Sequence, residues 1–330
     1  MNGSDDLTSD DEATLTCWAI ADGAAGHQSQ VKGLAEAIEA EYEAFDCRVA
    51  FPWILLPTGL IPLKPKSFKT SHSLSAEPPQ VVISCGRQAA LGALALKQIH
   101  GEDLFAICLQ NPKIKRDRFD LIIAPEHDQL SGANVVSTLG AMHHLSLKKL
   151  QTAASNGLVG GLEKLTARFV AVLLGGPNKY YAFDEADVKN LVQHLKSVIA
   201  DDLQLAIIPS RRTPVAAIQE LQKEFGEDHF VWNQQGENPY LPALALCSYC
   251  VVTSDSVSMI SEATATGQPV YIEQLQEQKA APKFQQFHTA MIERGYARSF
   301  EGAVEDWIYV PPQEAERVAK IVKERLAVGN

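Results

Sequence analysis

The chain has 330 residues, of which 46% are hydrophobic and 21% are charged, and its formal net charge at pH 7 is −11. This length predicts two domains of ordinary globular composition, and the acidic balance argues against nucleic-acid binding, which needs a basic surface. No apolar run reaches the roughly 18 residues that span a bilayer, so the sequence predicts no transmembrane segment.

Residues 1–13 begin with an acidic stretch and lack the basic start and apolar centre of a signal peptide, so we expect a disordered tail and a cytoplasmic protein. Beyond this tail, short apolar runs predict strands and helical spacing of apolar residues predicts helices. Strands that are apolar on both faces are typical of a parallel sheet covered by helices. We expect strands over 15–21, 81–84, 104–109, 121–124 and 134–138, and helices over 28–40 and 87–99.

A second alternating run begins near residue 169. Thr213 is predicted to cap a helix that has Pro214 at its first position. We expect strands over 169–174, 203–209 and 230–232, helices over 185–199, 214–225 and 240–246, a strand, turn and helix over 251–263, a strand over 270–272, and helices over 283–294 and 313–326.

The sequence therefore predicts the α/β class, with two doubly wound Rossmann-like domains facing a central cleft. We expect an N-terminal domain over residues 14–160 and a C-terminal domain over residues 161–312. A final helix over residues 313–330 is expected to pack back on the N-terminal domain.

Polar loops follow three strands of the second half. The segment 254–256 precedes a helix, whose start offers free N–H groups and a positive dipole end to a phosphate. Glu262, two turns further on, lies within reach of a ribose hydroxyl. Such residues also cap helices that bind nothing, but the convergence of three loops favours a ligand. The predicted donor and phosphate site comprises Gly175, Gly176, Lys179, Ser210, Arg211, Arg212, Thr213, Ser254, Asp255, Ser256, Ser258 and Glu262.

The first half offers two candidate loops and one ionisable cluster. A carboxylate beside a histidine suits a general base, and since neighbours on an extended chain point apart, we expect either His127 or Asp128 to be catalytic. No spacing typical of a metal site occurs, and neither a metal nor a cofactor is predicted. The acceptor side is assigned to strand-end turns, with plain strand-to-helix turns as the alternative: Asp22, Gly23, Gly26, His27, Gln30, Gly86 and Arg87.

Several motifs in a fixed order resemble one family, that of the plant mitochondrial fission protein named for its elongated-mitochondria phenotype, together with its bacterial relatives. The resemblance implies a two-domain fold like that of GT-B glycosyltransferases, in which the C-terminal domain holds a nucleotide-sugar donor and a helix-borne glutamate, here Glu262, grips the ribose. The match runs from about residue 18 to residue 272, and its main carriers are 22–23, 84–87, 125–128, 174–176, 210–214 and 253–263.

The leading hypothesis is a metal-independent, glycosyltransferase-like protein that binds a nucleotide-activated sugar. Its partner is then a phosphorylated small molecule, and its acceptor an envelope saccharide or lipid precursor presented near the apolar residues 51–63. The absence of a predicted transmembrane segment leaves peripheral membrane contact open. Two alternatives share the architecture: a non-catalytic scaffold and a non-hydrolysing nucleotide-sugar epimerase.

Overall fold

The computed structural model describes residues 14–199 and 203–328, so the tail predicted over residues 1–13 lies outside the described residues. The chain splits into two compact units, Met1–Ile122 with Ala319–Asn330, and Ile123–Val318. This division falls earlier than residue 160, because Leu139, Leu145 and Leu150 belong to a core of the second unit.

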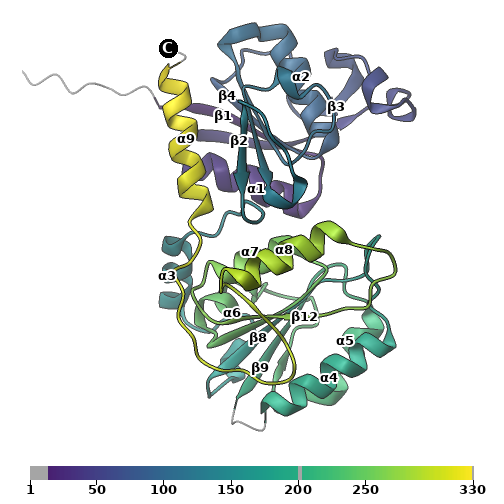
Figure 1. Cartoon of the computed structure of the whole chain (residues 1–330), viewed down its shortest axis with the longest axis vertical. Coiled ribbons are helices and arrows are strands. Elements are labelled where there is room, and N and C mark those ends of the chain that lie inside the picture. The colour runs from purple at the N-terminus through teal and green to yellow at the C-terminus, as the bar shows by residue number, and fades with distance from the viewer. Residues whose placement is uncertain (1–13, 200–202, 329–330) are drawn as a thin grey trace, which may run out of the picture. The chain divides into compact units, whose positions relative to one another are not determined.

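The first sheet has seven strands in the order β3-β2-β1-β4-β5-β6-β7. Strands β2, β1, β4 and β5 run parallel, whereas β3 is antiparallel to β2. Helices α1 (Ala25–Ala37) and α2 (Arg87–His100) lie on opposite faces of this sheet (Figure 1), as right-handed crossovers in opposite directions require. The strands are β1 Thr16–Ala21, β2 Glu41–Val49, β3 Phe68–Thr70, β4 Val81–Cys85, β5 Phe105–Leu109, β6 Leu121–Pro125 and β7 Val135–Thr138.

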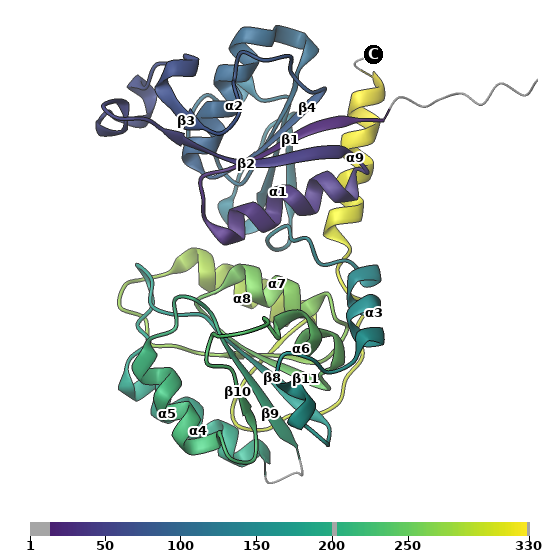
Figure 2. The same cartoon turned by 180° about the vertical axis from the view of Figure 1, so that it is seen from behind.

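The second sheet has six parallel strands in the order β10-β9-β8-β11-β12-β13. Helices α4 and α5 cover one face, and α6, α7 and α8 cover the other (Figures 1 and 2). The strands are β8 Phe169–Leu174, β9 Gln204–Pro209, β10 Phe230–Val231, β11 Tyr249–Thr253, β12 Val270–Glu273 and β13 Arg298–Ser299. The helices are α3 Leu147–Asn156, α4 Glu185–Ile199, α5 Val215–Phe225, α6 Tyr240–Leu246, α7 Val257–Thr264, α8 Pro282–Glu293 and α9 Glu314–Val328.

Strand β8 shows why this sheet is parallel and doubly covered. Val170 and Val172 belong to the core shared with α4 and α5, whereas Ala171 and Leu173 belong to the core shared with α6, α7 and α8. Successive side chains of a strand point to opposite faces, so a strand that is apolar throughout buries both. The predicted class of two doubly wound parallel-sheet domains is confirmed.

Short 3-10 helices complete the chain. In the described residues they are η1 Trp53–Leu55, η2 Thr58–Leu60, η3 Pro65–Ser67, η4 Gly101–Asp103, η5 Arg116–Arg118, η6 Glu126–Asp128 and η7 Leu162–Lys164. Among the described residues no helix is both long and apolar enough to cross a bilayer.

Candidate functional site

The candidate site lies where the second sheet reverses its winding direction. Strand β8 has β9 on one side and β11 on the other, and ligands of open α/β sheets bind at the carboxyl ends of such strands. The Gly175 N–H donates to Thr253 Oγ1 at 2.8 Å, and Ser210 Oγ donates to the Gly175 carbonyl at 2.9 Å. The three loops that follow β8, β9 and β11 therefore meet.

An ion pair between a buried carboxylate and a partly exposed arginine holds these loops together. The Asp255 side chain has no exposed surface and accepts hydrogen bonds from the Gly176 N–H at 3.0 Å and from Thr253 Oγ1 at 2.7 Å. Arg212 donates to the same carboxylate at 2.7 Å and to the Gly176 carbonyl at 2.9 Å. One carboxylate thus connects all three strand ends, and we call Asp255 and Arg212 the clamp.

The glycine pair has a packing role. A Cβ on Gly175 would lie 2.2 Å from the Asp255 carboxylate, and one on Gly176 would lie 2.2 Å from the Arg212 carbonyl oxygen. Both glycine N–H groups donate within the protein. The donors available to a ligand at this edge must therefore come from other residues.

Helix α7 supplies such donors. Its N-cap, Ser256, accepts a hydrogen bond from the Met259 N–H at 3.3 Å, while the first two N–H groups, of Val257 and Ser258, have no partner within the helix. Ser254 has a different position from the one expected: its side chain is buried and accepts from the Leu275 N–H at 3.0 Å. The positive helix end is therefore presented by residues 256–258.

Two exposed cations lie in the loops that follow β8 and β9. Arg211 is exposed and, among the described residues, forms no ion pair, in contrast to its neighbour Arg212. Lys179 is also exposed, with its ammonium 5.6 Å from the centroid of the Tyr180 ring. Thr213 does not cap α5 as predicted; its hydroxyl donates to the carbonyls of Leu174 and Gly175 because the N-cap position is taken by Pro214.

Glu262 lies on the buried side of α7. Its carboxylate accepts a hydrogen bond from the Tyr240 hydroxyl, at 2.5 Å. Burial, together with the negative charge of Glu262, raises the pKa of Tyr240 well above its usual value, so the phenol stays protonated and remains a donor. Tyr240 is not predictable from the sequence, since a single tyrosine at a helix start carries no motif.

The predicted catalytic turn η6 packs on α8. Asp128 forms an ion pair with Lys283 at 2.5 Å, and Glu126 forms one with Arg294 at 2.9 Å. Both carboxylates are therefore committed to cations of the second unit. Of the two residues proposed as the base, Asp128 is the less available.

His127 is partly buried and has an uncharged ring. Burial lowers its pKa, so the ring is neutral near pH 7, and its Nδ1 is buried without a hydrogen-bond partner in the described part of the chain. The ring makes an edge contact with Phe287, with centroids 5.8 Å apart. The adjacent His288 is hydrogen-bonded to the backbone of Ser254 and interacts electrostatically with His127. His288 thus lies between the turn that contains His127 and the β11 loop, a position that no sequence motif signals.

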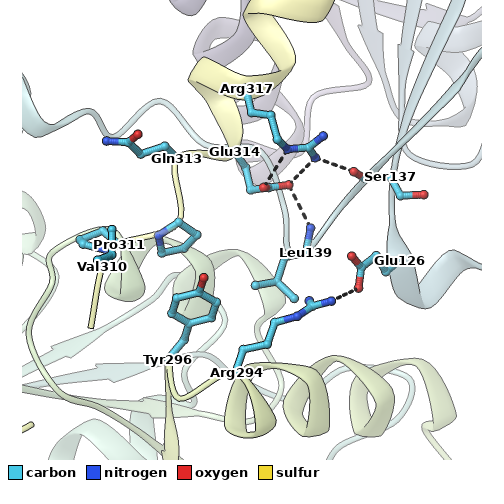
Figure 3. A pocket seen from close by; sticks show the side chains of 11 residues that line it. Glu126, Ser137, Leu139, Arg294, Tyr296, Val310, Pro311, Gln313, Glu314 and Arg317 are labelled. Carbon is cyan, nitrogen blue, oxygen red and sulfur yellow. Dashed lines mark hydrogen bonds and ion pairs between the residues drawn. The ribbon is translucent and has the colours of Figure 1, made fainter. Parts of the chain in front are cut away.

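A pocket of about 440 Å³ borders the turn η6, with Glu126 in its wall (Figure 3). Figure 3 shows that its two arginines are already paired: Arg294 with Glu126, and Arg317 with Glu314 at 2.8 Å. Arg317 also donates to the Ser137 carbonyl at 2.6 Å. The two arginines that line the pocket are thus neutralised by carboxylates of the same pocket. The sequence does not predict this pocket, because its walls come from segments far apart in the chain.

The acceptor-side candidates of the first unit form a compact group after β1 and β4. Asp22 bonds to His27 Nδ1 at 2.7 Å; although burial raises the pKa of Asp22, the His27 hydrogen bond and charge bring it below its usual value. Gly86 has φ +93° and no room for a Cβ, which would lie 2.3 Å from Asp22. A Cβ on Gly23 would overlap Arg48 in the same way.

The remaining acceptor-side candidates differ in exposure. Gln30 is buried and contacts Cys85 Sγ at 3.7 Å and Gln110 Nε2 at 3.2 Å, so it packs the loop from within. Gly26 lies in the first turn of α1, which begins three residues earlier than predicted. Arg87 is exposed at the start of α2 and forms no ion pair in the described residues.

Comparison with known proteins identifies the family of this chain. A family model described as mitochondrial fission ELM1 matches residues 25–326. The chain belongs to this family. It is 31% identical over 277 residues to the mitochondrial fission protein ELM1 of Arabidopsis thaliana, covering 76% of this chain and 64% of that relative's length. It is 26% identical to the uncharacterised protein RP120 of Rickettsia prowazekii (strain Madrid E), covering 96% of this chain and 99% of the relative.

Solved structures share the GT-B-like fold of this ELM1-family chain. A Staphylococcus aureus MnaA–UDP structure matches with TM-score 0.54 and 14% identity, covering 96% of this chain and 90% of the other. The Methanocaldococcus jannaschii UDP-GlcNAc 2-epimerase in complex with UDP-GlcNAc and UDP matches with TM-score 0.53 and 12% identity, covering 94% and 100%. A glycotransferase of kitacinnamycin gives TM-score 0.53 at 12% identity, covering 96% and 94%. At such identities the likeness concerns the fold alone.

Proposed function

We propose that the second unit binds a nucleotide-activated sugar, with its diphosphate at the start of α7. The observation that carries this proposal is the clamp, which holds three strand-end loops around a helix start whose first N–H groups have no helical partner. Arg211 and Lys179 add exposed positive charge in the same loops. Helix N-termini and arginine side chains are common binding groups for phosphate.

Two further observations support a nucleotide ligand. Structures of the same fold are described as complexes with UDP and UDP-GlcNAc, an analogy of architecture rather than of chemistry. Within this chain, Tyr240 holds the carboxylate of Glu262 in α7. In the proposed complex, this carboxylate accepts hydrogen bonds from the ribose hydroxyls.

The reaction proposed is metal-independent sugar transfer. The bond between the anomeric carbon and the diphosphate oxygen breaks, the acceptor oxygen bonds to that carbon, and neutral His127 takes the acceptor proton. The α7 dipole and Arg211 stabilise the charge on the departing diphosphate. For the acceptor, Asp22, His27 and Arg87 of the first unit remain our candidates, with an envelope saccharide or a lipid precursor as the class.

Ligand-induced thermal stabilisation tests the donor site. A nucleotide-activated sugar that binds only the folded chain raises the melting temperature. We expect one nucleotide class among UDP-, GDP-, ADP- and CMP-sugars to do so, and Arg211→Ala to weaken its affinity about tenfold, the effect of one lost charge-assisted hydrogen bond. Lys223→Ala, which removes an exposed cation at the far end of α5, is the matched control. Equal binding by both variants would place the ligand elsewhere.

A non-catalytic scaffold is the second candidate, and one observation favours it. Asp255, Asp128 and Glu126 are all paired with cations of their own unit, an arrangement that also suits a purely structural framework. The Arabidopsis relative is named for mitochondrial fission. Donor binding without turnover of any sugar would favour this candidate, whereas interconversion of a UDP-sugar without an acceptor would favour a non-hydrolysing epimerase.

A further inference from the structure

The segment between β2 and β3 carries a concentrated apolar surface. The exposed fractions of Phe51, Leu55 and Leu60 are 80%, 73% and 67%, and Ile54 and Leu56 are exposed at 45% and 38%. The segment projects beyond β3 at the edge of its sheet (Figures 1 and 2). Large apolar side chains exposed within ten residues of one another are typical of an interaction site. Elsewhere in the described chain, exposed large apolar side chains are Ile99, Leu147, Val215, Ile292, Ile308 and Val310.

The segment between β2 and β3 has a defined backbone structure. Two 3-10 helices, η1 and η2, carry Ile54, Leu55 and Leu60. The Ala50 N–H donates to the Ser67 carbonyl at 2.9 Å and closes the base of the segment. Ile61 and Leu63 are buried at 8% and 7% exposure, which anchors the outer turns to the unit. The segment therefore exposes its outer apolar side chains, while the neighbouring Ile61 and Leu63 are buried.

The charge around this surface is opposite to that of the whole chain. No acidic residue occurs between Asp46 and Glu77, although the formal net charge of the protein is −11. Lys64, Lys66 and Lys69 lie on the same segment, are exposed, and form no ion pair among the residues that the structure describes. An apolar tip beside unpaired lysines is complementary to an anionic lipid surface, which offers acyl chains below negative headgroups.

We propose that residues 51–69 are a docking surface for an anionic membrane. Phe51, Leu55 and Leu60 enter the interfacial layer, and Lys64, Lys66 and Lys69 contact lipid headgroups. A second copy of the chain fits less well, because a two-fold interface between identical surfaces would bring both sets of lysines together. This inference concerns the first unit and is independent of the proposed donor site.

Vesicle co-sedimentation of the full chain tests the proposal. We expect binding to vesicles of phosphatidylcholine and phosphatidylglycerol in equal parts, weakening with salt, and little binding to phosphatidylcholine alone. Phe51→Ser with Leu55→Ser should reduce binding at least about tenfold, because each side chain loses its transfer to an apolar layer. Changing Lys64, Lys66 and Lys69 to Gln should reduce it about fivefold per lysine.

Matched controls distinguish binding through this surface from non-specific adsorption to vesicles. Ile308→Ser with Val310→Ser removes two side chains that are 97% and 80% exposed elsewhere, and Lys113→Gln with Lys148→Gln removes exposed lysines outside the segment; neither should change binding. All variants should keep the wild-type melting temperature. Absence of wild-type binding to anionic vesicles would overturn the proposal, as would equal losses in the controls. Concentration-dependent dimerisation abolished by Phe51→Ser with Leu55→Ser, without vesicle binding, would reassign the surface to self-association.

Discussion

Replacing Asp255 by asparagine is expected to lower the free energy of unfolding by about 3 kcal/mol. Removing one partner of a buried ion pair costs about 3–5 kcal/mol, and the lower value applies because the Arg212 side chain is 44% exposed and regains water. The asparagine amide also places an NH₂ group against either the Gly176 N–H or the Thr253 hydroxyl, both of which donate to Asp255. Chemical denaturation monitored by circular dichroism measures this loss.

The clamp also predicts how the stability losses of two further variants rank against that of Asp255→Asn. Arg212→Met should cost at least as much as Asp255→Asn, because it leaves the Asp255 carboxylate, which has no exposed surface, without a counter-charge, even though Gly176 and Thr253 still donate to it. Glu185→Gln, which removes an exposed ion pair with Lys189, should leave stability unchanged. If Asp255→Asn were as stable as Glu185→Gln, the three loops would have to be held by something other than the clamp.

Acidification is expected to destabilise the second unit through His288. Burial lowers the pKa of His288 from 6.5 to about 4, so the unfolded chain binds a proton that the folded chain does not bind in this interval. Stability from this group is therefore fully present above pH 6.5 and is lost as the pH falls toward 4. A difference of roughly 2.5 pH units corresponds to about 3 kcal/mol.

The comparison of wild type with His288→Asn isolates this contribution. Asparagine keeps a donor near the position of Nδ1, which lies toward the Ser254 backbone because Nε2 has no partner within the described residues, but it does not titrate. Unfolding free energies measured from pH 4 to pH 7 should show a shallower slope for the variant. Parallel slopes would mean that His288 titrates normally, and that the surroundings of His127 and Ser254 are wetter than the structure shows.

The fold was largely predictable because its signals are local. The helices Glu185–Ile199 and Tyr240–Leu246 have the predicted bounds, since periodic apolar residues determine which face is buried. Strand β2 was missed because it lies near the edge of its sheet: Glu41, Glu43 and Ala44 are exposed, and the apolar pattern is interrupted. Its exposed half carries no signal of a buried strand.

The location of the candidate site was predictable from the sequence, but the partners of its side chains were not. Loops that follow neighbouring parallel strands must converge, so three of them could be named from the sequence. The partner of each side chain depends on contacts that are remote in sequence. The Ser254 hydroxyl accepts a hydrogen bond from the Leu275 N–H, and Asp255 forms an ion pair with Arg212. No motif announces His288 or Lys283, whose importance comes only from the packing of α8 on the turn that contains His127.

The most direct test of the donor site is an amide NMR titration of the ¹⁵N-labelled protein with UDP-, GDP-, ADP- and CMP-sugars in turn. The proposal predicts saturable shifts at Val257 and Ser258, the N–H groups at the start of α7, accompanied by Arg211. Shifts confined to the pocket around Arg294 and Arg317, or no saturable shift with any nucleotide class, would contradict a diphosphate site at this helix.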